Sequence, residues 1–420
     1  MLLRLKLIDL INFLILAYLL SLIFLYPYGV PLIGSNNLRV SDLFAFPILG
    51  LGAILLIHKN QVYHYPVLNS FVLVFILFEL LYPILGLFVG YEGLGAVGNT
   101  LRMALIWLPF YFYILLSEPS KVLNLDSFIN KVLRYSIVLN IIYGIIQIAV
   151  RVRMLPYSFL VTKHLEPFAV DSHFRVVDGI RASGFFVNTT GLSVFAILCM
   201  SYFLARYIGK KSTMDAVFVL LSFLALILTT SRAGVLTALI ILGVGWFFIP
   251  NKGKLVSVLI FLLAGLIGYF VIDYYVGTDI LFGRFSRLLE GGATADRSFS
   301  HRTERIWPKV FQALESFEFG TLVNAVNKVG LVDSGYLTYY AQGKWPFIVI
   351  LILFLLGTLI KSLNILADRS NWANFLVLSV VIYLSFTLVV LNPMRSPFVI
   401  FFLLFGLWMA ESHQARHAKN

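Results

Sequence analysis

Long apolar runs recur along the whole chain, and short polar segments separate them. A helix needs about 20 apolar residues to cross a bilayer, and most of these runs approach that length. The pattern therefore predicts an all-α polytopic membrane protein with about twelve transmembrane helices. The expected spans are 7–25, 42–57, 67–89, 101–117, 132–150, 183–206, 214–230, 232–249, 255–276, 345–361, 373–391 and 396–411.

The composition agrees with this pattern. Hydrophobic residues make up 60% of the 420 residues and charged residues only 12%, against about 45–50% and about 25% in soluble domains. A soluble fold cannot bury so much apolar surface, which excludes a soluble enzyme, a disordered chain and a fibrous repeat. The single cysteine, Cys199, excludes an internal disulfide and a multi-cysteine metal site.

We expect residues 1–420 to form a single transmembrane domain with two long outer (periplasmic-side) loops, 151–182 and 277–344. Within the larger loop, apolar residues recur at helical spacing from 281 to 289. Pro308 can begin another helix, with Phe311, Leu314 and Phe317 on one side. Both segments are typical of amphipathic helices at the membrane interface, and plain packing elements are the alternative.

The distribution of Lys and Arg sets the expected orientation. With the N-terminus in the cytoplasm, the inner segments carry fifteen of these cations, ten of them Lys, and the short outer loops carry four, all Arg. This bias satisfies the positive-inside rule and places both termini in the cytoplasm. With the long loops included, the outer face carries seventeen cations, thirteen of them Arg. Arginine suits planar contact with phosphate or carboxylate, so anion recognition is predicted there; headgroup contacts and salt bridges are the alternative.

Each helix that runs inward from the outer face has a cation near its first turn. These cations are Arg39, Arg102, Arg181, Arg232, Lys344 and Arg395. A cation opposes the positive end of the helix dipole, and the arrangement is explained if an anion such as a diphosphate lies between the helix ends. The alternative is that each cation is a snorkelling anchor, which we favour for Arg39 and Lys344. For Arg181 and Arg232 we favour a role in binding the anion.

Other chemical signals are weaker. The segment 93–98 matches GxGxxG but lies between two expected spans without a βαβ context, so the match is due to chance. The histidines form no cluster at metal-ligand spacing, and we expect no metal and no cofactor. Glu79 lies within an expected span, where a carboxylate is a functional candidate by default; a neutral carboxyl hydrogen-bonded inside the bundle is the alternative.

Four short stretches near span boundaries share a pattern of Arg, Gly and aromatic residues. They are R-A-S-G-F-F-V-N at 181–188, T-T-S-R-A-G at 229–234, the segment from Arg302 to Trp307 followed by Gly320, and D-S-G-Y-L at 333–337 followed by Gly343. In this order they resemble motifs of the O-antigen ligase and polymerase superfamily. The resemblance covers about 181–360, and the first 150 residues add only the pattern of spans.

The resemblance implies a glycosyltransferase of the C-type membrane class, which uses polyprenyl-diphosphate-linked sugars at the outer side of the cytoplasmic membrane. Arg181 and Arg232 are then expected to stabilise the charge of the diphosphate leaving group without a metal. Further candidate diphosphate ligands are Arg102, Arg302, Arg305 and Arg395. For Arg302 and Arg305, salt bridges to acidic neighbours are the alternative.

Asp333 is the candidate general base for the acceptor hydroxyl, with Glu304 in reserve. An ion pair of Asp333 with Lys328 or an arginine is the alternative. Tyr336 is expected either to pack against sugar or to anchor the interface. Ligases of the superfamily usually have His where this chain has Asp333, which favours a Wzy-type polymerase that joins the repeat units of a surface polysaccharide.

Two other functions stay open. A ligase would use the same donor site and transfer the finished glycan to another acceptor. A multi-span transporter or flippase is the alternative from another class, although carriers of this size commonly show two related halves, which this sequence does not. The expected partners are the undecaprenyl-diphosphate-linked glycan donor and acceptor, membrane lipids and a chain-length regulator, with no nucleic acid. The expected location is the bacterial cytoplasmic (inner) membrane.

Overall fold

The structure is a computed structural model, and it describes most of the helical segments of the chain. The described residues are 2–25, 29–31, 37–58, 65, 70, 72–89, 106–117, 122–151, 155, 182–186, 188–249, 300–322 and 334–417. Contacts divide the chain into two compact units, Met1–Leu51 with Ser120–Ser286 and Gly52–Pro119 with Arg287–Asn420. Each unit is described separately below.

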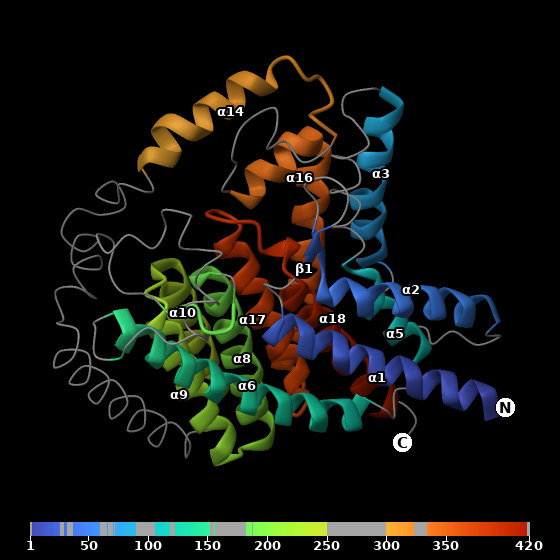
Figure 1. Ribbon diagram of the computed structural model, residues 1–420, viewed down its shortest axis with the longest axis vertical. Helices are drawn as coiled ribbons and strands as arrows, with labels where there is room; N and C mark the ends of the chain where they lie inside the picture. Colours follow the sequence, from blue (N-terminus) through green and yellow to red (C-terminus); the bar gives the residue numbers. More distant parts are fainter. Residues whose placement is uncertain are drawn as a thin grey trace. The chain divides into compact units, whose positions relative to one another are not determined.

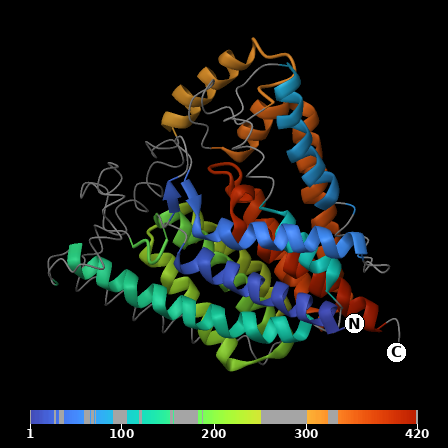
Figure 2. The ribbon, with the colours of Figure 1, turned by 45° about the vertical axis from the view of Figure 1, so that its right-hand side comes forward.

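The first unit is a helical bundle built around α8. Its helices are α1 (Leu2–Phe24), α6 (Val122–Arg151), α8 (Thr189–Lys210), α9 (Thr213–Leu228) and α10 (Arg232–Phe248), and two short antiparallel strands, β1 (Gly29–Pro31) and β2 (Asn37–Arg39), precede α2 (Val40–His58). Helix α8 packs against α6, α9 and α10, which lie side by side in Figures 1 and 2. Phe195, Cys199 and Phe203 of α8 are fully buried, so α8 forms the core of this unit.

The second unit is also helical, and its contacts centre on α17. Its elements are α3 (Leu73–Val89), α5 (Leu108–Leu116), the π-helical turn η6 (Arg302–Ile306), α14 (Trp307–Leu314), α16 (Gly335–Ser362), the 3-10 turn η7 (Leu363–Leu366), α17 (Trp372–Thr387), the 3-10 turn η8 (Pro393–Arg395) and α18 (Pro397–His417). Helix α17 contacts both α16 and α18, while α3 and α14 contact α16. In the core, the indole N–H of Trp408 donates to the hydroxyl of Tyr65 over 2.9 Å.

Side-chain caps explain where three of the helices begin. Asn188, Ser231 and Ser334 directly precede α8, α10 and α16. The side-chain oxygen of each accepts a hydrogen bond from the backbone N–H three residues later, over 2.8, 3.3 and 3.4 Å. Such caps satisfy N–H groups that have no partner inside the helix, and therefore fix its first turn.

Every expected span outside 255–276 overlaps a described helix, although the one within 101–117 has only nine residues, Leu108–Leu116; 255–276 lies outside the described residues. Four helices are long and apolar enough to cross a membrane: Val40–Ile57, Leu125–Ala149, Thr189–Lys210 and Gly335–Leu366. Shorter apolar helices are Leu10–Phe24, Leu73–Val89, Thr213–Leu228, Arg232–Phe248 and Trp372–Thr387. By length and composition the chain is a helical membrane protein, and the count of twelve spans stays a prediction.

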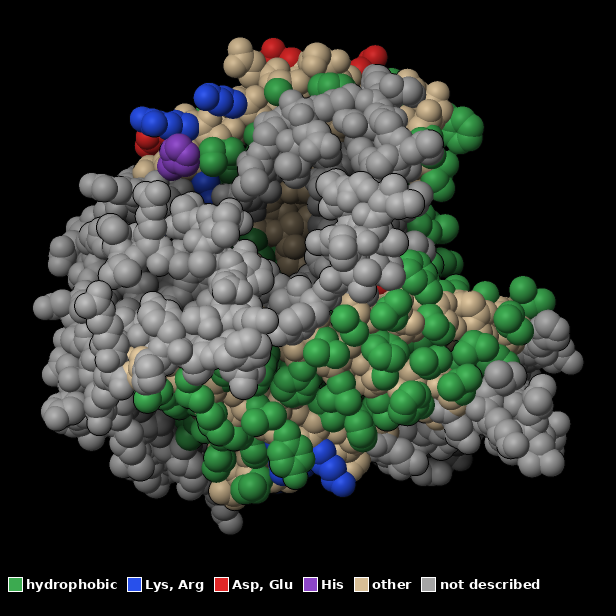
Figure 3. Space-filling model, in the orientation of Figure 1, with side chains coloured by type: hydrophobic (Ala, Val, Ile, Leu, Met, Phe, Trp, Pro, Cys, Tyr) green, Lys and Arg blue, Asp and Glu red, His purple; other side chains and the backbone are tan. Residues whose placement is uncertain are grey.

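The surface of the described helices supports this class. Figure 3 shows hydrophobic side chains over much of the described surface. Exposed large side chains include Phe13, Phe46, Ile57, Phe88 and Phe247. Soluble monomers rarely expose apolar surface on this scale, whereas a lipid-facing surface requires it.

Several expected span boundaries differ from the structure: α6, for example, begins at Val122, ten residues before the span expected at 132–150. The span expected at 183–206 begins only at Thr189, because the preceding residues form a tight turn. The span expected at 345–361 begins where α16 resumes after the non-helical residues Gly343 and Lys344, and residues 335–342 form a further helical segment before it, inside the expected outer loop. Within that loop, the helix expected to start at Pro308 is confirmed as α14, but it buries Val310 and Leu314, while Phe311 is half exposed. The segment 281–289 lies outside the described residues.

Candidate functional site

A tight turn leads into α8, and two buried side chains of α6 hold its backbone. The Oε1 of Gln147 accepts hydrogen bonds from the backbone N–H groups of Ser183 and Gly184, each over 3.0 Å. Its Nε2 donates to the carbonyl oxygen of Gly184 over 3.1 Å. The Oδ1 of Asn140 accepts from the N–H of Phe185 over 2.9 Å. Because these bonds satisfy backbone groups that the turn cannot pair internally, α6 fixes the shape of the turn.

The turn requires glycine at one position. Gly184 has φ of +57°, in the left-handed region, and a Cβ there would collide with the Oδ1 of Asn140. Asn188 caps α8, as described above. The Gly and the Asn of the stretch at 181–188 therefore have structural roles. Its arginine, Arg181, lies outside the described residues.

A backbone hydrogen bond joins this turn to the turn that carries Arg232. The N–H of Ala182 donates to the carbonyl oxygen of Leu228, the last residue of α9, over 2.9 Å. Ser231 then caps α10, and Arg232 is the first residue of that helix, with a partly buried side chain. The structure thus brings together the described parts of two stretches that the sequence separates by a whole helical hairpin.

Close packing holds the first turn of α10 in place. A Cβ at Gly234 would lie 2.9 Å from the Cδ1 of Leu226 and would collide with the Oγ of Ser193 in α8. Glycine is therefore needed where α10 approaches α8 and α9. This packing therefore fixes the backbone at Arg232, which lies two residues earlier on the same turn.

In the second unit, the start of α16 is fixed to the end of α17. The backbone N–H groups of Gly335 and Tyr336 donate to the carbonyl oxygen of Leu388 over 2.8 and 3.2 Å, and the hydroxyl of Ser334 donates to the same oxygen over 3.2 Å. The hydroxyl of Tyr336 donates to the carbonyl oxygen of Ser385 over 3.2 Å. Tyr336 thus has a structural contact, while a contact with sugar stays a prediction. The candidate base Asp333 lies outside the described residues.

Helix α16 is interrupted eight residues after it begins. Gly343 and Lys344 have non-helical dihedral angles, and Lys344 has φ of 54°. The Nζ of Lys344 donates to the carbonyl oxygen of Leu314, the last residue of α14, over 2.8 Å, and lies 5.5 Å from the ring centroid of Tyr340. A cation is favourable at the C-terminal end of a helix. Lys344, which the sequence suggested to be an anchor in the headgroups, therefore has a partner within the protein.

The remaining outer cations lie on η6 and α14. Arg305, Glu304 and Lys309 are exposed, and Arg302 is partly buried. Figure 3 shows Lys, Arg and His side chains gathered on the helix that Figure 1 labels α14. Both candidate diphosphate ligands of this segment are thus on one short helical element.

The opposite side of α14 is apolar and covered. Val310 and Leu314 form a buried cluster with Leu337 and Ala341 of α16. This packing leaves the charged side of α14 open to solvent and orients it away from α16.

The other predicted site residues are placed only in part. Glu79 is buried within α3, which agrees with both interpretations of a carboxylate inside a span. Arg395 lies in η8, but its side chain lies outside the described residues, as does the whole of Arg102. Among the described residues, no three His, Cys, Asp or Glu side chains group closely enough to hold a metal.

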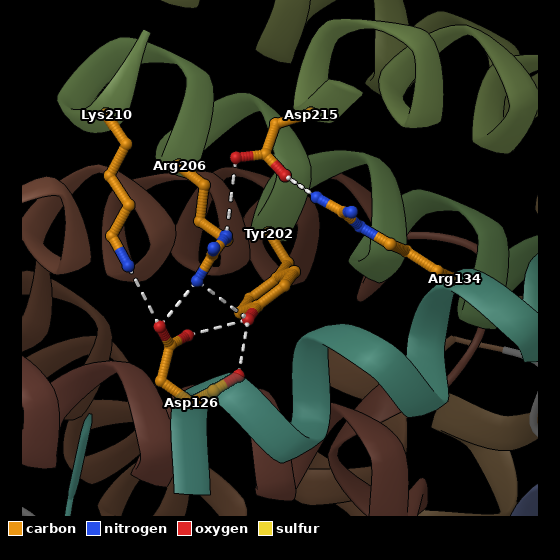
Figure 4. Close-up of polar contacts among 6 residues, drawn as sticks. All are labelled: Asp126, Arg134, Tyr202, Arg206, Lys210 and Asp215. Atoms are coloured by element: carbon orange, nitrogen blue, oxygen red, sulfur yellow. Dashed lines mark hydrogen bonds and ion pairs between the residues drawn. The ribbon is translucent and has the colours of Figure 1, made fainter. Parts of the chain in front are cut away.

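An ionic network that the sequence did not predict joins α6, α8 and α9 (Figure 4). Asp126 of α6 accepts hydrogen bonds from the Nη1 of Arg206 over 2.5 Å, the hydroxyl of Tyr202 over 2.6 Å and the Nζ of Lys210 over 3.1 Å. Tyr202, Arg206 and Lys210 are spaced four residues apart, so they project from one face of α8.

Asp215, in the first turn of α9, completes the network. Its Oδ1 accepts from the Nη2 of Arg134 in α6 over 2.7 Å, and its Oδ2 lies 3.4 Å from the Nε of Arg206. Asp215 is fully buried, and such a carboxylate is tolerated only when cations compensate its charge. The network therefore ties three helices together at one end.

The sequence contains a signal for this network. Arg134, Arg206 and Lys210 are among the fifteen cations that the positive-inside rule places in the inner segments. The spacing of Arg206 and Lys210 along α8, together with Asp126 and Asp215 at the edges of neighbouring apolar runs, indicates charges that pair between helices.

The geometry defines a helical membrane protein with two motif-bearing turns side by side in one unit, and a cationic helix packed on the start of a membrane helix in the other. The sequence matches no protein-family model and no curated protein.

Proposed function

We propose that the chain is a glycosyltransferase that uses polyprenyl-diphosphate-linked oligosaccharides, of the type that polymerises the repeat units of a surface polysaccharide. The observation that supports this function best is the hydrogen bond from Ala182 to Leu228. It joins the turns that follow Arg181 and precede Arg232, the two residues that the family resemblance selects for binding the diphosphate.

The chemistry assigned to Arg232 follows from its place at the start of α10. Free N–H groups and the helix dipole favour an anion at a helix N-terminus, and a guanidinium adds bidentate contacts to phosphate oxygens. In the proposed reaction the acceptor hydroxyl attacks the sugar C1, the bond from C1 to the phosphate oxygen breaks, and the diphosphate leaves with the electron pair. Arg181 and Arg232 would stabilise that charge, and Asp333 would take the hydroxyl proton, with Glu304 in reserve.

The setting of this reaction is proposed from the chain's charge and apolar pattern. Twelve spans with both termini in the cytoplasm would place the two arginines and Asp333 at the outer face, where a lipid-linked donor is available. Arg302 and Arg305 on η6 would offer further phosphate contacts, because Arg305 is exposed and Arg302 is partly so.

The test is deletion of the gene in its source organism, followed by gel analysis of the surface polysaccharide. We expect the ladder of chain lengths to be reduced to a single repeat unit on its usual carrier. Wild-type protein should restore the ladder, whereas Arg232→Ala and Asp333→Ala should not. Losing one stabilising donor of this kind costs about 10²–10³-fold in rate.

Two variants control for misfolding. Leu236→Ala changes an exposed side chain of the same helix and should restore the ladder fully. Arg232→Lys keeps the positive charge but loses the planar guanidinium that forms two parallel hydrogen bonds to phosphate, so it should restore the ladder weakly. Long chains that accumulate on the polyprenyl lipid would indicate a ligase instead. An unchanged polysaccharide in the deletion strain would reject the glycosyltransferase, and transport would then be the better hypothesis.

A further inference from the structure

One face of α6 is exposed and apolar, and Lys131 lies at one end of this face. Lys131, Tyr135, Leu139, Ile142 and Ile145 recur every three or four residues, which places them on one side of the helix. The last four have exposed fractions of 72%, 44%, 50% and 51%. We call these five residues the α6 stripe.

The opposite face of α6 is polar and buried. It carries Asp126, Asn140 and Gln147, which bind α8 and the turn before α8 as described above. A helix at a water-exposed surface has its polar face outward, so α6 has the reverse arrangement. Together with the apolar length of Leu125–Ala149, this indicates that the α6 stripe faces lipid.

Positive charge is concentrated at the lysine end of the stripe. Lys131 is exposed and lies one turn before Arg134, which binds Asp215 of α9. At the same end of the bundle, Lys210 binds Asp126 while 41% of its side chain stays exposed, and the exposed Lys211 follows it. The two carboxylates described at this end, Asp126 and Asp215, thus already bind Arg206, Arg134 and Lys210.

The length of the apolar part of the stripe fits one leaflet. Tyr135 and Ile145 are ten residues apart, which corresponds to about 15 Å along a helix. Half of the hydrocarbon core of a bilayer is also about 15 Å. Tyrosine next to lysine is typical of the boundary between acyl chains and headgroups, which here falls at Lys131 and Tyr135.

We propose that the α6 stripe is a binding site for an anionic phospholipid, whose phosphate group binds Lys131 and Lys211 and whose acyl chain lies along Tyr135, Leu139, Ile142 and Ile145. An anionic phospholipid carries both a phosphate group that the lysines attract and an acyl chain that covers the apolar residues. A soluble anion has no acyl chain. Lipid binding at this stripe does not require the chain to be an enzyme.

The affinity test uses the purified full-length protein in detergent, titrated with phosphatidylglycerol or phosphatidylcholine and analysed by native mass spectrometry. The wild type is expected to bind phosphatidylglycerol more tightly. Each lysine near an anionic headgroup contributes about fivefold in affinity, so Lys131→Gln with Lys211→Gln should remove most of the preference. Lys309→Gln, at an exposed lysine of α14, is the matched control and should retain it. A double variant that keeps the wild-type preference would overturn the site.

A second measurement locates the lipid. The only cysteine of the chain, Cys199, is fully buried, so a fluorophore can be attached selectively to Tyr135→Cys. In nanodiscs, brominated phosphatidylglycerol should quench this label more strongly than brominated phosphatidylcholine. A label at Phe247→Cys, an exposed position on α10, should be quenched equally by both. Equal quenching at position 135, or disulfide-linked dimers through it, would show that bulk lipid or a second copy of the chain covers the stripe instead.

Discussion

Gly234 and Gly243, two glycines of α10, have opposite surroundings. A Cβ at Gly234 would meet the Cδ1 of Leu226 and the Oγ of Ser231, each at 2.9 Å, and would collide with Ser193, whereas no atom lies within 4 Å of a Cβ at Gly243. One helix therefore contains a position where packing demands glycine and another where it does not. The first lies beside Arg232, and the second is an internal control.

Replacing these glycines should have unequal effects. Gly234→Ala forces an extra methyl group into a packed contact and should lower the free energy of unfolding by about 1–3 kcal/mol. Gly243→Ala should be neutral or raise it by up to about 1 kcal/mol, because alanine favours the helix. Thermal unfolding of both variants in the same detergent checks this. Equal midpoints for the two variants would mean that α10 does not pack on α8 as described.

The side chain of Gln147 is predicted to hold the turn before α8. Gln147→Leu leaves the N–H groups of Ser183 and Gly184 without an acceptor inside the bundle, at a cost of about 1–3 kcal/mol for each buried group. Gln147→Glu keeps an acceptor for both N–H groups, and in this buried site the carboxyl is expected to be neutral, so that its O–H can donate to the carbonyl oxygen of Gly184; this variant should therefore destabilise less. The measurement is again thermal unfolding, and the expected order is wild type, then Gln147→Glu, then Gln147→Leu. A leucine variant as stable as the wild type would contradict the assigned hydrogen bonds.

Local signals in the sequence predicted much of the fold. Apolar runs located the helices, because a bilayer selects for uninterrupted apolar length. Pro308 lies in the first turn of α14, where proline fits, although residues 300–306 before it are helical as well. Ser231, directly before the span expected at 232–249, caps α10 with its side chain, as serine at a helix start favours.

Long-range contacts explain what the sequence did not reveal. Residues 183–188 are apolar enough to belong to a span, but Gln147 and Asn140 pair with their backbone, and Gly184 has a left-handed conformation, so these residues form a turn before α8 begins. Asp126 and Asp215 bind cations on other helices, about 80 residues away along the chain, and no local pattern in the sequence reveals such pairs. For the candidate site, the turn that carries Arg232 was predicted, whereas its contact with Ala182 depends on tertiary packing.

The ionic network predicts a large and non-additive effect of single substitutions. Asp126→Asn removes the carboxylate from Arg206, which stays almost fully buried, and breaking a buried pair costs about 3–5 kcal/mol. In that variant Arg206 keeps only Asp215 as an anionic partner, and adding Arg206→Gln removes this poorly compensated cation, so the double variant should be less destabilised than the sum of the two single variants. A double-mutant cycle by denaturant or thermal unfolding measures the coupling. Additive effects would mean that the two side chains do not interact.

Asp368 lies outside the apolar spans, and its carboxylate should make the free energy of unfolding depend on pH. Asp368 accepts hydrogen bonds from the hydroxyl and the backbone N–H of Ser370, over 2.6 and 2.9 Å, and its Oδ2 lies 3.6 Å from the Nδ1 of His413. The hydroxyl of Ser370 is the main cause that lowers the pKa of Asp368 below its ordinary value of 3.8, and the nearby His413 adds to it. Because the folded pKa lies below the unfolded one, this stabilisation is present above about pH 4 and is lost as the pH falls through the folded pKa.

The matching experiment is a series of thermal midpoints from pH 6 to pH 3 for the wild type and Asp368→Asn. The asparagine cannot ionise, so the variant should lose less stability than the wild type over the acidic part of this range. The difference should be small, because the carboxylate is largely exposed and water screens its interactions. Asp368→Glu, which ionises but is too long for the same hydrogen bonds to Ser370, is the control, and its curve should follow that of the asparagine variant. Parallel curves for the wild type and the asparagine variant would show that Asp368 has the same pKa in the folded and unfolded chain.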